Sequence, residues 1–129
     1  MLTLLQVAEN GLKGLVAQQG KRSVNISCQY RGPNGLKCFL GHSIPDAVYE
    51  LRFEHTPLAE LIHGPLSDIF SRDDYHKLVA LQGQCHDGII CVAEGKPFFE
   101  EAKAAAIKIA KMAGYPTTSL QEIEYVDAV

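Results

Sequence analysis

The sequence lacks the features that mark membrane-spanning, secreted and nucleic-acid-binding proteins. No apolar run approaches the roughly 18 residues that cross a bilayer, and the chain does not open with a basic segment followed by an apolar one. The formal net charge is -3, and lysines and arginines are spread along the chain instead of forming a basic patch. We therefore expect a cytoplasmic protein that binds neither membranes nor nucleic acid.

Several catalytic and metal-binding signatures are also missing. The sequence contains no glycine-rich phosphate loop, no nucleophile elbow and no cysteine pair at the close spacing of a zinc knuckle. Its four cysteines are Cys28, Cys38, Cys85 and Cys91. Without a leader that indicates an oxidising compartment, we expect reduced, buried thiols and no metal or other cofactor, with a zinc site as the less favoured alternative.

The composition is that of a folded globular protein. Of the 129 residues 47% are hydrophobic and 21% are charged, which fits one domain with a core of its own. We predict a single domain over residues 1-129, in which residues 115-129 form a C-terminal arm that is either packed or loose.

Apolar residues recur at helical spacing along most of the chain. Thr3 with Gln6 suits a capping box at the start of the first helix, and Gly20 suits a left-handed cap after its end. Ser43, Thr56 and Ser71 stand where later helices would begin. The patterns predict helices over residues 3–19, 43–52, 57–63, 72–87 and 97–113. Residues 89–93 fit a buried strand or a helix, and we favour the helix. Two of these helices have a stripe of residues expected on the buried face: Tyr75, Leu78, Leu81, Gln82 and Cys85 in the first, and Phe98, Ala102, Ala105, Ile109 and Met112 in the second.

One stretch, residues 28–40, predicts a β-hairpin. Pro33 and Asn34 suit the centre of a type I turn, with Gly35 in the left-handed position that follows. In the resulting register Tyr30 faces Cys38, and Cys28 faces Leu40 on the core side. The predicted fold class is therefore α+β, a single helix-rich domain with one β-hairpin in its N-terminal half.

His86 and Asp87 form the most catalytic-looking pair. A carboxylate can orient an imidazole that acts as a general base or as a metal ligand. Neighbouring residues on an α-helix do not face each other, however, so this contact requires that the helix has ended at His86. A nucleophilic cysteine paired with one of the five histidines is a further alternative, although no spacing selects a particular pair.

The predicted hairpin tip is the better candidate for a binding surface. Tyr30, Arg31, Pro33 and Asn34 combine an aromatic ring, a guanidinium and a rigid turn on a protruding element. Tyrosine and arginine are enriched among the residues that dominate binding energy at protein interfaces. A solvated hairpin tip without a partner is the alternative.

Two motifs resemble those of a known group of proteins. The pattern CxYRGxxGLKCxxGxxIPDxxY covers residues 28–49, and LQxxxHD covers residues 81–87. Together with the N-terminal helix, they are similar to small uncharacterised proteins encoded by bacteriophages and prophages. The resemblance implies a context, because small phage accessory proteins often bind and inhibit host factors.

We therefore expect a phage-type accessory protein that acts by protein-protein binding, on a host enzyme or a defence complex in the host cytoplasm. The binding residues expected are Tyr30, Arg31, Asn34, Lys37, His86 and Asp87. The alternatives are a small metal-dependent or acid-base enzyme centred on His86 and Asp87, and a small-molecule-binding module.

Overall fold

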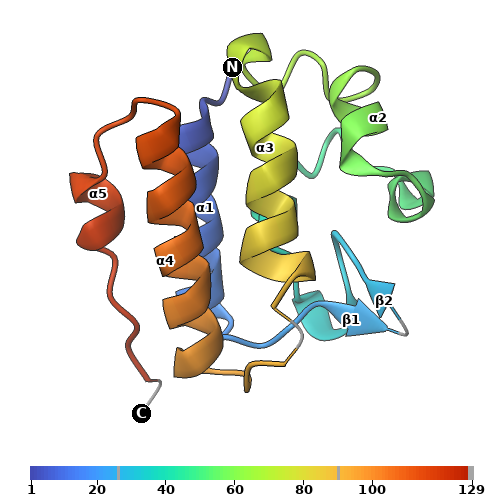
Figure 1. The fold of residues 1–129 in the computed structure, drawn as a ribbon. Helices are drawn as coiled ribbons and strands as arrows, with labels where there is room; N and C mark the ends of the chain where they lie inside the picture. Colours follow the sequence, from blue (N-terminus) through green and yellow to red (C-terminus); the bar gives the residue numbers. More distant parts are fainter. Residues whose placement is uncertain (26, 90, 128–129) are drawn as a thin grey trace.

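The computed structural model describes residues 1–25, 27–89 and 91–127, and three helices form its centre (Figure 1). Helices α1 (Leu4–Ala17), α3 (Tyr75–Gln82) and α4 (Lys96–Met112) lie side by side and contact one another. Helix α2 (Leu58–Ile62) packs on α3, and α5 (Thr118–Gln121) packs on α4 and α1. None of the helices in the described part of the chain is both long and apolar enough to cross a membrane.

The remaining elements are short. The 3-10 helices span Pro33–Gly35, Leu40–Ser43, Leu51–His55 and Arg72–Asp74, and a π-helical turn, Gly83–Asp87, follows α3 directly. All five phenylalanines are fully buried: Phe39, Phe53, Phe70, Phe98 and Phe99.

Helix α1 begins as its sequence predicts, but it ends at Ala17, and Gln19 as well as Gly20 has a positive φ after it. The Thr3 hydroxyl accepts the Gln6 N–H at 3.2 Å, and the Gln6 side chain accepts the Thr3 N–H at 2.9 Å, which completes the capping box. Gly20 adopts a φ of 67° and donates its N–H to Leu15 at 2.8 Å. The glycines inside this helix also have a packing role, because a Cβ on Gly11 would lie 2.6 Å from the Phe39 ring.

The helical stripes predicted for α3 and α4 are confirmed, apart from their ends. The residues expected on the buried face of α3 and its continuation are all buried: Tyr75, Leu78, Leu81, Gln82 and Cys85. On α4, Phe98, Ala102 and Ile109 are buried and Ala105 is half-buried, whereas Met112 at the last turn is 63% exposed.

One carboxylate connects three distant segments of the chain. Oδ2 of the buried Asp74 accepts the N–H of Leu4 at 2.8 Å and the hydroxyl of Tyr115 at 2.7 Å. The start of α1, the start of α3 and the segment after α4 therefore meet at one group. Beyond Tyr115 the chain forms α5, whose Leu120 is buried, so the described part of the C-terminal arm packs against the helices.

The predicted α+β fold class, with its β-hairpin, is wrong. About 55% of the chain is helical and about 5% is in strands. Among the described residues the strands are β1 (Val24–Asn25) and β2 (Ser27–Cys28), which pair with each other, so Cys28 lies opposite Val24 and not opposite Leu40. Two paired strands of two residues each are too short to form a sheet that acts as a layer of the fold.

The predicted hairpin stops after a few contacts near its tip. Gly32 donates to Leu36 at 2.8 Å, and Cys38 donates to Tyr30 at 3.3 Å, but the two arms separate beyond this pair. The backbone N–H of Leu40 instead donates to the side chain of Gln82 on α3 at 3.0 Å. A tertiary hydrogen bond thus replaces the ladder bond that a longer hairpin needs.

The helices predicted over residues 43–52 and 89–93 are also wrong, and arginines explain both errors. Arg31 donates to the carbonyl of Ile44 at 2.9 Å and pairs with Asp46 at 2.6 Å, so Asp46 does not cap a helix. Arg22 donates to the carbonyls of Ile89 and Val92, which directs them away from a helical ladder. Position 90 lies outside the described residues.

The start predicted for α2 differs as well. Pro57 is the capping residue of this helix, and it makes no side-chain cap hydrogen bond. The hydroxyl of Thr56, predicted to cap the helix, donates instead to the carbonyl of Arg52 at 3.1 Å in the preceding 3-10 helix.

Candidate functional site

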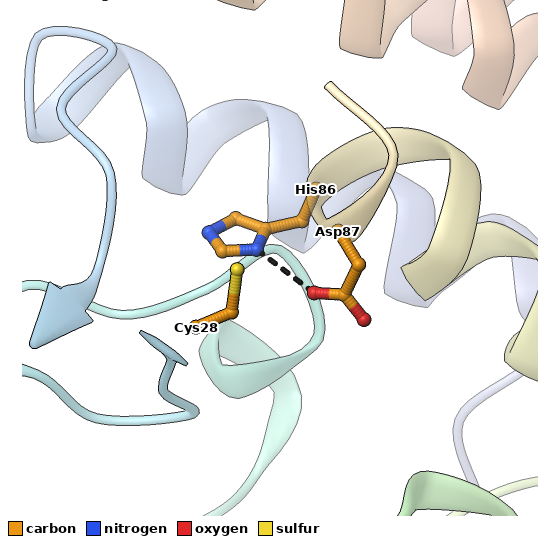
Figure 2. A group of neighbouring side chains, drawn as sticks. All are labelled: Cys28, His86 and Asp87. Atoms are coloured by element: carbon orange, nitrogen blue, oxygen red, sulfur yellow. Dashed lines mark hydrogen bonds and ion pairs between the residues drawn. The ribbon is translucent and has the colours of Figure 1, made fainter. Parts of the chain in front are cut away.

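Three side chains from two distant segments meet beside the short strand pair (Figure 2). Cys28 comes from β2, whereas His86 and Asp87 come from the π-helical turn after α3. One ligand atom from each residue lies within 4.8 Å of the other two. We call Cys28, His86 and Asp87 the Cys-His-Asp cluster.

The π-helical turn places His86 and Asp87 in contact. On a regular α-helix adjacent side chains diverge by about 100°, so the sequence predicts a contact only where the helix has ended. The wider turn over Gly83–Asp87 replaces the α-helix at this point, and His86 Nδ1 lies 3.2 Å from Asp87 Oδ1. Single π-helical turns of this kind occur frequently at functional sites.

A glutamine on α3 fixes the carboxylate of the cluster. The amide nitrogen of Gln82 donates to Asp87 Oδ1 at 3.2 Å, while its amide oxygen accepts the N–H of Leu40. Gln82 is only 6% exposed, and its hydrogen bond to Leu40 is buried, whereas its bond to Asp87 is partly buried. The side chain of Asp87, by contrast, is 49% exposed.

Aromatic packing also holds the imidazole of His86 in place. Its side chain is 1% exposed, and its ring makes an edge contact with Phe98 at a centroid distance of 5.8 Å. The guanidinium of Arg22 covers the Phe98 ring at 4.5 Å. His86 Nε2 is buried and makes no hydrogen bond within the described part of the chain, whereas Nδ1 contacts Asp87 Oδ1.

The surroundings of Cys28 raise the pKa of its thiol. Partial burial raises the pKa of Cys28, and the charge of Asp87 together with a hydrogen bond to it raises this pKa further, while Arg22 acts in the opposite direction. The thiol is therefore protonated near neutral pH in the absence of a further cation. All four cysteines are free, with Cys38 and Cys85 buried as predicted and Cys28 and Cys91 exposed against the prediction.

A cleft of about 380 Å³ opens onto the cluster. Cys28 and Asp87 line it directly, whereas His86 lies beneath and is not part of the lining. We call this space the Cys28 cleft. Its other lining residues are Gln29, Tyr30, Glu54, His55, Thr56, Pro57 and Gln82.

Tyr30 lines the Cys28 cleft, and Arg31 is engaged within the protein. The Tyr30 hydroxyl donates to the carbonyl of Thr56 at 3.1 Å. Besides its ion pair with Asp46, the guanidinium of Arg31 lies 4.4 Å from the centroid of the Tyr49 ring. The Glu54 carboxylate accepts the backbone N–H groups of both Tyr30 and Arg31, so its two oxygens support the wall of the cleft.

The structure divides the six predicted binding residues among separate places. Asp87 and Tyr30 share the Cys28 cleft, with His86 beneath it. Asn34 and Lys37 line a different hollow, beside the C-terminal end of α1. Sequence reasoning did not join Cys28 to His86 and Asp87, because no motif spacing connects segments so far apart in the chain.

No protein-family model, curated protein or solved structure matches the chain. The resemblance to phage-encoded proteins therefore stays a prediction.

Proposed function

We propose that the protein binds one divalent metal ion of the zinc class through Cys28, His86 and Asp87. The observation that carries this proposal is the convergence of a thiol, an imidazole nitrogen and a carboxylate from two distant segments. Thiolate, imidazole and carboxylate are the side-chain groups that bind zinc in proteins.

The spacing of the cluster suits a tetrahedral ion. With metal-ligand bonds of roughly 2.0 to 2.3 Å, the ligand atoms of such a site lie about 3.3 to 3.7 Å apart. His86 Nδ1 and Asp87 Oδ1 are already 3.2 Å apart, and all three ligand atoms lie within 4.8 Å of one another. Closing the site requires a small shift of Cys28, which lies at the exposed end of a two-residue strand.

Three protein ligands would leave a fourth position, and two of them, Cys28 and Asp87, line the Cys28 cleft. Structural zinc sites are usually closed by four protein ligands, whereas catalytic sites keep one position for water or substrate. A metal held in this way polarises a water molecule or a substrate oxygen. Metal-dependent hydrolysis of a small polar molecule is therefore the reaction class that the arrangement favours.

A cysteine nucleophile fits the same residues less well. In a Cys-His-Asp relay the imidazole lies between the thiol and the acid and uses a different ring nitrogen for each. Here His86 Nδ1 and the Cys28 thiol both interact with Asp87, and His86 Nε2 is buried without a partner among the described residues. The raised pKa of Cys28 also disfavours a resting thiolate.

Metal content and cobalt spectroscopy test the proposal. Purified protein, loaded with zinc and then dialysed, should retain one equivalent, and cobalt should give a thiolate-to-metal charge-transfer band. Cys28→Ser and Asp87→Asn should lose both signals, because each removes a ligand at an exposed position. Cys91→Ser is the matched control, since Cys91 is also free and exposed. Failure of the wild-type protein to bind either metal would overturn the proposal.

Host-protein binding by a phage accessory protein stays a prediction, and so does a cytoplasmic location. Host-protein binding predicts a stable complex that forms without metal. The metal proposal predicts that the purified protein retains one equivalent of zinc. Removing zinc with a chelator before a binding or activity assay separates these functions.

A further inference from the structure

A second hollow, of about 500 Å³, lies between the C-terminal end of α1 and the turn at Pro33–Gly35. Two lysines and a histidine line it, and its lining contains no acidic residue, although the whole chain has a net charge of -3. We call it the lysine hollow. Its lining residues are Gly14, Ala17, Gln18, Gln19, Lys21, Asn34, Gly35, Leu36, Lys37 and His42.

One side chain holds both lysines in place. Gln18 Nε2 donates to the carbonyl of Lys21 at 2.7 Å and to that of Lys37 at 2.9 Å, and Gln18 Oε1 accepts the N–H of Lys37 at 3.2 Å. Two loops far apart in the sequence are thereby joined through their backbones. The two ammonium groups take no part in these bonds.

Neither lysine is neutralised by the protein. Across residues 1–25, 27–89 and 91–127, the ion pairs involve neither Lys21 nor Lys37. Two of the carbonyls at the end of α1, those of Gly14 and Leu15, accept the N–H groups of Gln18 and Gly20 at 3.0 and 2.8 Å. The hollow is therefore a concave, positively charged surface.

His42 adds a neutral ring to the same wall. Burial, with smaller contributions from Lys37 and His86, lowers the pKa of His42 to about 4. Its Nε2 is buried and has no hydrogen-bond partner in the described part of the chain. Gly14 allows the ring to sit here, because a Cβ at this position would lie 2.3 Å from His42 Nδ1.

We propose that the lysine hollow binds a phosphate group of a small molecule, with Lys21 and Lys37 neutralising its charge. Two lysines that line one hollow suit a dianion, and the Asn34 side chain in the same lining supplies an amide donor. The proposal is independent of the metal site, because no residue of the Cys-His-Asp cluster lines this hollow.

Nuclear magnetic resonance titration with inorganic phosphate and with pyrophosphate tests this site, with sodium chloride at equal ionic strength as the reference. We expect saturable shifts of the backbone amides of Gln18 and Lys37 and of the His42 ring. Saturation by pyrophosphate at lower concentration than by inorganic phosphate would indicate a polyphosphate ester as the natural ligand. The reverse order would indicate a monophosphate.

Single charge-removing variants locate the site. Lys21→Gln and Lys37→Gln should each weaken binding about tenfold, the equivalent of one charge-assisted hydrogen bond. Lys108→Gln, on the exposed surface of α4, is the control and should bind as the wild type does. Cys28→Ser should also bind phosphate normally, which separates this proposal from the metal site. Linear shifts that match those with chloride, or equal weakening by Lys108→Gln, would overturn it.

Discussion

The side-chain amide of Gln82 donates a hydrogen bond to Asp87 across 3.2 Å, one turn further along the same helical segment. The other end of this amide accepts the N–H of Leu40, in the segment that the sequence assigns to a hairpin arm. One buried side chain therefore both ends the hairpin and positions a proposed metal ligand. The fold and the candidate site depend on the same residue.

Gln82→Leu should weaken both features at once. The variant leaves the buried N–H of Leu40 without a partner, and we expect the free energy of unfolding to fall by about 1 to 3 kcal/mol. Zinc affinity should fall about 10- to 100-fold, because Asp87 loses its positioning bond. Urea denaturation and a zinc titration measure the two effects.

Gln84→Leu is the matched control for this prediction. Gln84 lies two residues further along and is exposed, so its replacement should change stability by less than about 0.5 kcal/mol. Unchanged zinc affinity in a folded Gln82→Leu protein would show that Gln82 does not position the ligand.

Local sequence signals predicted the long helices because their physical causes are local. The capping box of Thr3 and Gln6, the left-handed Gly20 and the buried stripe of α3 all depend on residues within a few turns of one another. The hairpin was predicted on the same kind of signal, and its tip contacts do form. Its arms separate because Leu40 bonds to Gln82, a partner that no local pattern reveals.

Two glycine substitutions should have opposite effects on stability. Gly11→Ala places a Cβ 2.6 Å from the ring of Phe39, which is fully buried and has no room to move. Overpacking should outweigh the better helix propensity of alanine and cost about 1 to 2 kcal/mol.

Gly83→Ala meets no atom within 4 Å and has a φ of -62°, so it should stabilise the protein by about 0.4 to 1 kcal/mol. Thermal denaturation of both variants gives the sign of each effect, and a stabilised Gly11→Ala variant would contradict the packing of α1 against Phe39.

Stability should fall at alkaline pH because folding favours protonated tyrosines. The hydrogen bond to Asp74 raises the pKa of Tyr115 to about 12, and burial with a hydrogen bond to Glu54 raises that of Tyr49 to about 12. Both values exceed the value of about 10 for an unfolded tyrosine. This contribution is thus complete below about pH 10 and is lost as the pH rises towards 12.

Denaturation curves recorded between about pH 8 and about pH 12 measure this loss of stability. This range includes the tyrosine pKa values of both the unfolded and the folded protein. Tyr115→Phe should lower stability at the neutral end and flatten the decline at the alkaline end. Tyrosinate absorbance follows ionisation directly, because the chain has no tryptophan. An equal slope for the wild type and Tyr115→Phe would mean that Tyr115 ionises as freely in the folded protein as in the unfolded one.

The candidate site could be predicted only in part. His86 and Asp87 stand out in the sequence as a base and a carboxylate, but their contact depends on a π-helical turn that sequence periodicity does not distinguish from α-helix. Cys28 joins them through the tertiary fold, from a strand pair of two residues on each side. The residue types of His86 and Asp87 therefore indicated a site. The sequence spacing between Cys28 and this pair did not.

Arg22→Lys should loosen the segment that follows the π-helical turn. The Arg22 guanidinium donates to the carbonyls of Ile89 and Val92 and covers the ring of Phe98, which in turn contacts His86. A lysine keeps the charge but not the planar fork or the stacking, so we expect a loss of about 1 to 3 kcal/mol. Hydrogen exchange should quicken over residues 91–95, while α1 keeps its protection.

Arg72→Lys, at an exposed arginine, is the control and should leave the stability and these exchange rates unchanged. Equal exchange rates in the wild type and Arg22→Lys would show that charge alone, and not the guanidinium geometry, holds this segment against Phe98.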